Sequence, residues 1–280
     1  MTTVRVTCCQ LSPRIGDLVG NVEQSAEAVR TAVAGGADVV VLPELVTSGY
    51  VFESADEVAD VAITPAHAVF ENWSDAVARS RRSGSVVIGG FCERGDNDVL
   101  YNSAAVIDAS GVRAVYRKTH LWDREKLWFR AGDALPPVVD TVVGRIGVAI
   151  CYDLEFPEVS RYLALAGADL VAVPTNWPLV DRPAGERPPE VVIAMAAART
   201  NRIAIACCDR AGTERGQEWT SATTIISVDG WPAATIGPDQ MATADLDLAA
   251  ARDKRLTDLA DAFGDRRVDL YPSPMGGFES

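Results

Sequence analysis

The sequence predicts a layered α/β fold with a mixed β-sheet, and three observations lead to this prediction. Short runs of strand type alternate with helical patterns, most clearly around residues 39–42 and 145–150. Three strand-like runs follow one another within residues 85–117 with no helix between them, which requires antiparallel pairing. No Gly-x-Gly-x-x-Gly or phosphate loop follows any strand, so a doubly wound nucleotide-binding fold fits poorly.

Composition and charge limit the partners of this 280-residue chain. Hydrophobic residues make up 48% of it, and no composition break or repeat divides it, so we expect a single domain over residues 1–280. The 26 basic and 39 acidic residues give a net charge of −13 with no basic run to offset it. Nucleic acid and anionic membranes are therefore not expected as partners. Without a signal pattern or an apolar run of about 18 residues, we expect a cytoplasmic location.

The first part of the chain predicts a strand over residues 4–10 and then a helix from Asn21, as N-cap, to about Ala34. Residues 39–42 form a continuous apolar run, typical of a strand buried on both faces. Glu44 follows this run almost immediately. A carboxylate at the exit of a buried strand is unusual, although most glutamates in such loops are only solvated charges.

Residues 64–83 predict a second helix, with Thr64 as N-cap and Pro65 at the first helical position. Three strands are expected next, over residues 85–91, 100–107 and 112–117. Lys118 closes the last of them and opens an irregular segment, 118–133, in which aromatic and charged residues alternate. Long irregular segments are often functional, whereas a lysine at a strand end is usually only a surface charge.

Cys151 stands where a strand meets a helix. The apolar run 145–150 ends at Cys151, and Pro157 opens a helical pattern that reaches Ala166. We expect a thiol in this turn to be exposed at the sheet edge, where the positive end of the helix dipole favours the thiolate. The alternative, that Cys151 is a small buried apolar residue, is the commoner fate of a cysteine.

The rest of the chain continues the α/β pattern. A helix is expected from Pro188 to about Asn201, and a short helical pattern begins at Leu246. Further strands are expected over residues 170–173, 203–208, 223–227 and 241–245. Asn176 follows the first of these strands, so it also lies at a strand exit.

The other cysteines do not indicate a metal site. The six cysteines are Cys8, Cys9, Cys92, Cys151, Cys207 and Cys208. None forms a Cys-x-x-Cys pair, and the two histidines stand apart, so we expect no metal and no other cofactor. The two adjacent pairs lie inside expected strands and are interpreted as packing residues.

The three strand-exit residues Glu44, Lys118 and Cys151 make chemical sense as a group. A cysteine with a pKa near 8.5 is only partly ionised at neutral pH, so it needs a base or a neighbouring cation. Glu44 could act as the base, and the Lys118 ammonium could stabilise the thiolate. The ammonium, together with the backbone N–H of Tyr152, could also stabilise the oxyanion formed when sulfur attacks a carbonyl.

Three segments resemble the motifs of the nitrilase superfamily, the carbon–nitrogen hydrolases. They are Val-Leu-Pro-Glu-Leu (41–45), Tyr-Arg-Lys-Thr-His-Leu (116–121) and Gly-Val-Ala-Ile-Cys-Tyr-Asp-Leu-Glu-Phe-Pro-Glu (147–158). The likeness runs from Val4 to Tyr271. Three motifs in the family's order make a specific signal.

The resemblance implies a four-layer α-β-β-α sandwich with mixed sheets, a homodimer or larger homo-oligomer, and a Glu-Lys-Cys triad. By position, Glu44 would be the general base, Lys118 the oxyanion stabiliser and Cys151 the nucleophile. Glu125 matches a second family glutamate that orients the substrate and Lys118, although it could be an ordinary surface charge. Thr200-Asn201 departs from the Glu-Asn found in many members, which weakens any subgroup assignment.

The expected reaction is the hydrolysis of a small carboxamide to a carboxylic acid and ammonia through a cysteine thioester. An N-carbamoyl amino acid or a nitrile could use the same triad, and a thiol-based sensor or binding protein on this scaffold is the non-enzymatic alternative. The residues expected to contact the substrate are Tyr50, Trp122, Tyr152, Asn176 and Trp177. The aromatic residues could instead only pad the core or a dimer interface. We see no evident basic cluster for a substrate carboxylate, although Arg130, Arg182 and Arg187 remain candidates, so a neutral carboxamide is preferred.

Overall fold

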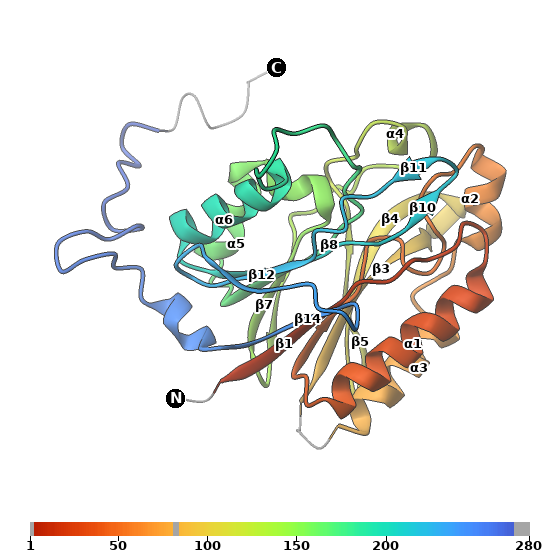
Figure 1. Ribbon diagram of the computed structural model, residues 1–280, viewed down its shortest axis with the longest axis horizontal. Coiled ribbons are helices and arrows are strands. Elements are labelled where there is room, and N and C mark those ends of the chain that lie inside the picture. Colours follow the sequence, from red (N-terminus) through yellow and green to blue (C-terminus); the bar gives the residue numbers. More distant parts are fainter. Residues whose placement is uncertain (1–2, 81–83, 272–280) are drawn as a thin grey trace.

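The computed structural model describes residues 3–80 and 84–271 and has four layers, helix, sheet, sheet and helix (Figure 1). Two six-stranded sheets form the inner layers. Helices α1 (Leu18–Ala34) and α3 (Ala68–Ala78) lie against one sheet. Helices α5 (Pro157–Leu165) and α6 (Pro189–Asn201) lie against the other (Figure 1). The four-layer α-β-β-α sandwich with mixed sheets is therefore confirmed.

The first sheet has the strand order β14-β1-β2-β3-β4-β5. Its strands are β1 (Val4–Cys9), β2 (Val39–Val41), β3 (Val86–Arg94), β4 (Leu100–Asp108), β5 (Gly111–Arg117) and β14 (Met241–Leu246). Strands β1, β2 and β3 are parallel, whereas β4, β5 and β14 pair antiparallel to their neighbours. The antiparallel run expected within residues 85–117 is thus confirmed.

The second sheet repeats this arrangement, with the order β13-β12-β9-β8-β7-β6. Its strands are β6 (Val138–Thr141), β7 (Gly144–Val148), β8 (Leu170–Pro174), β9 (Ala204–Cys208), β12 (Thr224–Ile226) and β13 (Pro232–Thr235). Strands β7, β8 and β9 are parallel, and the flanking strands are antiparallel. A separate hairpin pairs β10 (Thr213–Glu214) with β11 (Gln217–Glu218).

Apolar side chains fill the space between the sheets and beneath the helices. One buried cluster joins residues of both sheets with α5 (Pro157–Leu165) and α6 (Pro189–Asn201). A second cluster lies between the first sheet and helices α1 (Leu18–Ala34) and α3 (Ala68–Ala78). Cys8, Cys9, Cys207 and Cys208 are fully buried in these clusters, as the packing interpretation expects.

Two helix starts differ from the sequence-based predictions. Helix α1 begins at Leu18 because Asp17, not Asn21, caps it by accepting the N–H of Gly20. Asn21 lies inside the helix, where its side chain bonds the backbone of Arg14. The helix expected from Thr64 starts only at Ala68, because residues 64–67 form a turn and His67, not Thr64, caps the helix by accepting the N–H of Val69; its expected end, 81–83, lies outside the described residues.

Short elements were not predicted. They include α2 (Ala55–Val61), α4 (Glu125–Trp128), β6, β13, the β10–β11 hairpin and a 3₁₀ helix at Asp96–Asp98. The 3₁₀ helix at Leu248–Arg252 matches the short pattern expected there. Within residues 3–80 and 84–271, no helix is long and apolar enough to cross a membrane.

Candidate active site

Glu44 lies just beyond β2, as predicted, and it is completely buried. Its turn packs closely on β3, since a Cβ at Gly90 would lie 2.6 Å from the Glu44 Cα and 2.5 Å from the Leu45 nitrogen. Leu45 has a φ of +48°, a left-handed conformation that is uncommon for a residue with a side chain. The absence of a side chain at Gly90 therefore lets the turn seat Glu44 inside the protein.

Lys118 directly follows β5 and is also completely buried. Its Nζ donates to Glu44 Oε1 at 2.7 Å and to Glu125 Oε1 at 2.8 Å. Its backbone is fixed on both sides, because its N–H donates to the Asn102 carbonyl and its own carbonyl accepts the N–H of Gly132. The ammonium is thus held between two carboxylates that lie far from one another in the sequence.

Glu125 is buried at the start of α4, so it is not an ordinary surface charge. Its Oε1 accepts both the Lys118 ammonium and the Tyr50 hydroxyl, the latter at 2.6 Å. Its Oε2 accepts the backbone N–H of Trp122 at 3.1 Å. Both oxygens are therefore occupied, which fits a carboxylate that orients its neighbours.

The charges of this group determine its protonation. Burial by itself would lower the pKa of Lys118, but the negative charges of Glu125 and Glu44 outweigh it and raise that pKa well above its usual value. Burial raises the pKa of Glu44 to about 7, against the lowering effect of Lys118. At neutral pH, Lys118 is thus a fixed cation, and Glu44 is close to the midpoint of its titration. Glu44 Oε2 has no hydrogen-bond partner among the described residues.

Cys151 begins a 3₁₀ helix, Cys151–Glu155, which two residues separate from the end of β7, and its own φ is +47°. It is only 7% exposed, so the expectation of an exposed thiol at the sheet edge is wrong. Burial, and then the negative charge of Glu44, raise the pKa of Cys151 well above its usual value, while Lys118 and the backbone N–H of Asn176 lower it. The expectation that this turn favours the thiolate is therefore also wrong, because burial outweighs the local N–H groups. The resting thiol needs a base.

Asn176 connects the cysteine to the glutamate. Its backbone N–H is close enough to the Cys151 thiol to lower the pKa of that thiol, and its side-chain Nδ2 donates to the Glu44 carbonyl at 2.9 Å. The Glu44 N–H in turn donates to the Thr175 carbonyl at 3.4 Å. The structure thus brings Glu44, Lys118, Cys151 and Glu125 into one buried group contributed by both sheets.

The predicted aromatic residues occupy different environments. Trp122 is 40% exposed and meets the Tyr152 ring edge-on, with ring centroids 4.8 Å apart. Trp177 is buried in the core cluster that joins both sheets with α5 and α6. Tyr50 donates its hydroxyl to Glu125, so this group is already engaged. Their contacts with a substrate stay predictions.

Sequence reasoning missed two buried polar residues of the site. Asn102 on β4 donates its side-chain amide to Glu44 Oε1 at 2.7 Å, beside Lys118. Asp209 follows β9 and accepts the backbone N–H of Trp177 and the Thr175 hydroxyl, so it braces the segment that carries Asn176. A polar residue at the exit of a buried strand is the signal that led to Glu44, and it could have found Asp209. Asn102, inside a strand, carried no such signal.

Asp153 joins the lysine segment to the cysteine turn. One of its oxygens accepts the backbone N–H of Ile150 and the Tyr116 hydroxyl, each at 3.0 Å. The other accepts the backbone N–H of His120 at 3.0 Å and contacts the His120 ring at 2.8 Å. This single buried carboxylate therefore ties residues on both sides of Lys118 to both sides of Cys151.

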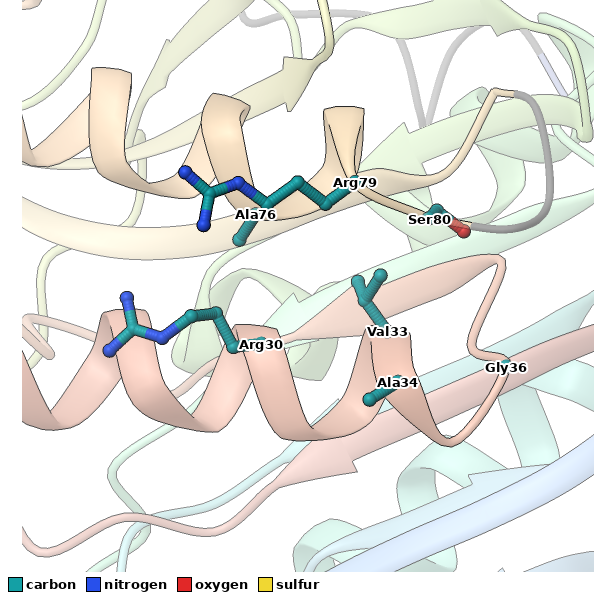
Figure 2. Close-up of a pocket in the computed structure, with 7 residues that line it drawn as sticks. All are labelled: Arg30, Val33, Ala34, Gly36, Ala76, Arg79 and Ser80. Atoms are coloured by element: carbon teal, nitrogen blue, oxygen red, sulfur yellow. The ribbon is translucent and has the colours of Figure 1, made fainter.

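A cavity of about 560 Å³ lies elsewhere, between the C-terminal ends of α1 and α3 (Figure 2). Figure 2 shows Arg30 and Arg79 extending along it in the same direction. Arg30 already pairs with Glu27 at 2.7 Å, and no predicted site residue lines the cavity. Among the described residues, no group of three or more histidine, cysteine or acidic side chains is arranged to hold a metal.

Comparison with known proteins identifies the family of this chain. The family model for carbon–nitrogen hydrolases matches residues 5–256. A protein named nitrilase from Pyrococcus abyssi is 36% identical over 272 residues, covering 96% of this chain and 99% of its own. An (R)-stereoselective amidase from a Pseudomonas species is 35% identical over 210 residues, covering 75% of this chain and 72% of its own. The chain belongs to the carbon–nitrogen hydrolase family.

A solved structure adds a chemical observation from a relative. An amidase from Nesterenkonia sp. AN1 superimposes with a TM-score of 0.78 and 25% identity, covering 97% of this chain and all of the other. That structure is a glutamate-to-glutamine mutant in which acrylamide has added to the active-site cysteine. In this relative, a cysteine is thus the group that reacts with an amide-bearing molecule.

Proposed function

We propose that this carbon–nitrogen hydrolase cleaves a small carboxamide to a carboxylic acid and ammonia, with Glu44, Lys118 and Cys151 as its catalytic triad. The observation that carries the proposal is the buried Lys118 ammonium between two carboxylates, 2.7 Å from Glu44 and 2.8 Å from Glu125. Burying a charged group of this kind costs desolvation free energy that offsets most of the gain from its ion pairs, so it stabilises the fold little. It is useful where charge must be stabilised during a reaction.

In the first half of the reaction, Glu44 takes the proton of the Cys151 thiol through Oε2, which has no other partner among the described residues. The sulfur attacks the amide carbon, and the carbonyl oxygen becomes an oxyanion facing Lys118 and the Tyr152 N–H. Glu44 then passes its proton to the amide nitrogen. The C–N bond breaks, ammonia leaves and a thioester remains on Cys151.

The second half repeats the chemistry with water. Glu44 removes a proton from a water molecule, the hydroxide attacks the thioester carbon, and the same donors hold the second oxyanion. The C–S bond breaks, the acid leaves and the Cys151 thiolate regains its proton from Glu44. Glu125 takes no proton in this scheme. It keeps the Lys118 ammonium directed at the oxyanion.

Tyr50, Trp122, Tyr152, Asn176 and Trp177 are proposed to surround the substrate. Trp122 and Tyr152 are in edge-on contact near the cysteine turn, which favours a substrate with a small apolar part. The name of the Pyrococcus relative supports a nitrile as the second candidate, since a nitrile would enter as a thioimidate at the same sulfur. An N-carbamoyl amino acid is the third candidate substrate. A homo-oligomer, a single domain and a cytoplasmic location stay predictions.

The test is ammonia release from short carboxamides, short nitriles and N-carbamoyl-β-alanine, with Cys151→Ala as the control variant. We expect ammonia from at least one carboxamide, none from the variant, and a transient acyl mass on the intact protein that disappears as product forms. Turnover that survives in Cys151→Ala would refute the mechanism. A bare thiol with no turnover on the whole panel would favour the sensor alternative.

A further inference from the structure

A second buried ion pair lies next to the catalytic group, on the segment after β9. Arg210 Nη2 meets Glu214 Oε1 at 3.1 Å and also donates to the Pro13 carbonyl at 2.8 Å. Both side chains are almost completely buried. The proposed chemistry uses neither residue, so their burial requires another explanation.

Glu214 holds the backbone of the segment that carries Tyr50. Its second oxygen, Oε2, accepts the N–H of Tyr50 at 2.8 Å and that of Val51 at 2.6 Å. The close approach depends on Gly49, which has a φ of +82° and whose Cβ would lie 2.8 Å from Glu214 Oε1. The carboxylate therefore fixes where the Tyr50 backbone lies.

The Tyr50 ring is held from the side as well. It meets the Trp219 ring edge-on, with centroids 5.4 Å apart. The Arg210 guanidinium lies over the same indole, 4.7 Å from its ring centroid. Arg210 and Glu214 thus restrain both the backbone and the ring of Tyr50.

The Tyr50 hydroxyl transmits this restraint to the catalytic group. It donates to Glu125 Oε1 at 2.6 Å, and the same oxygen accepts the Lys118 ammonium at 2.8 Å. The direction of the ammonium therefore depends on where Glu125 Oε1 is held.

We propose that Glu214, paired with Arg210, is a positioning residue that acts through Tyr50 and Glu125 to direct the Lys118 ammonium. The proposal rests on the function proposed above for Lys118. Glu214 itself touches no reacting atom. Its contribution is the geometry of the hydroxyl that Glu125 accepts, and small displacements of such groups are costly in rate.

A double-mutant cycle between Glu214→Gln and Tyr50→Phe tests this relation. Gln keeps the size of the side chain but presents an amide to Arg210, and Phe removes the hydroxyl that reaches Glu125. We expect each single variant to lower kcat by about tenfold, with KM changed much less, and the double variant to stay within about threefold of Tyr50→Phe. Independent effects would multiply to about a hundredfold, and that result, or a wild-type kcat in Glu214→Gln, would overturn the proposal.

Asp169→Asn is the matched control. Asp169 is also a buried carboxylate that pairs with an arginine, Arg252, and accepts a backbone N–H, that of Arg145. It lies just before β8, at the end of that strand opposite Asn176. We expect this variant to lose stability in urea but to keep the wild-type kcat per folded molecule. If Glu214→Gln does not fold, Arg210→Lys, which keeps the charge but loses the guanidinium that lies over the Trp219 ring, takes its place in the cycle.

The rate of Cys151 alkylation by acrylamide separates this proposal from the proposed function. The other five cysteines are almost inaccessible, so a single mass addition reports on Cys151. Because Lys118 lowers the pKa of Cys151, a misdirected ammonium should move the pH midpoint of alkylation upward in Glu214→Gln and Tyr50→Phe, but not in Asp169→Asn. An unchanged midpoint in both would overturn the positioning role. A shifted midpoint in a protein that hydrolyses no amide would refute only the proposed function.

Discussion

The two sheets have matching topologies but supply different parts of the site. Each has three parallel strands flanked by antiparallel ones, and Glu44, Lys118, Cys151 and Asn176 all follow strand ends. The first sheet supplies the charges, Glu44 and Lys118, together with Asn102. The second supplies the Cys151 sulfur and the Asn176 amide that faces it.

The two sets are held in place by different means. The charged groups hold one another through side-chain contacts of 2.7–2.8 Å. The sulfur is placed by backbone, in a turn where Cys151 itself adopts a left-handed conformation. Polar contacts join the two sets; one is the hydrogen bond that the Asn176 side-chain amide donates to the Glu44 carbonyl. The charges can therefore be preorganised within one sheet, whereas a working site requires both sheets to pack correctly.

Removing the cation should give the largest effect. In Lys118→Met, Glu44 and Glu125 would face one another in a buried space with no positive charge between them. We expect turnover to fall by about 10²–10³-fold, because an oxyanion donor is lost, and the free energy of unfolding to fall by about 3 kcal/mol. Amide turnover and urea unfolding measure the two effects. A variant within threefold of the wild-type rate would remove Lys118 from the mechanism.

Removing the base should separate reactivity from turnover. Because the pKa of Glu44 is raised to about 7, the wild-type kcat/KM should fall tenfold per pH unit below about pH 7 and level off above it. In Glu44→Gln, turnover should fall by about a hundredfold, but the thiol loses a negative neighbour that raises its pKa. Cys151 alkylation should therefore reach its midpoint at a lower pH than in the wild type. A midpoint that stays or rises would contradict this account of the thiol.

The same residue should leave a signature in stability. The folded protein holds the Glu44 proton more tightly than the unfolded chain, whose glutamates titrate near 4. The stability that Glu44 contributes is therefore complete below about pH 4 and is lost as the pH rises through about 7. Glu44→Gln should show a flatter dependence of unfolding free energy on pH over that range, measured with urea at several pH values.

A backbone change should give the smallest effect. Gly90→Ala would place a methyl group against the Glu44 turn, 2.5 Å from the Leu45 nitrogen. We expect kcat to fall by about tenfold, with a smaller change in alkylation of Cys151, because the turn must move while the sulfur belongs to the other sheet. Gly35→Ala, at the end of α1, adds the same methyl far from the site and should leave kcat unchanged. Equal rates in the two variants would show that the turn tolerates displacement.

Much of the site was predictable because its chemistry lies at strand exits. Strand-like runs around residues 39–42, 112–117 and 145–150 predicted the strands, and Glu44, Lys118 and Cys151, which follow them, proved to be buried. Local sequence patterns predicted the helix caps less well where contacts with distant residues decide which groups a side chain bonds. Asn21, expected as the N-cap of the first helix, lies inside that helix, and its side chain instead donates to the carbonyl of Thr47, which is distant in the sequence.

The amino-acid sequence alone was enough to predict the order of the longer strands and helices, the layered α/β class, and which carboxylate, ammonium and thiol leave the buried strands. Those features follow from residue patterns within short stretches of chain. Only the tertiary structure decided that Asn102 joins Glu44, that Glu214 reaches the Tyr50 segment, and that the Cys151 thiol is protonated at rest. These outcomes depend on burial and on charges brought together from distant positions, and a one-dimensional pattern contains neither.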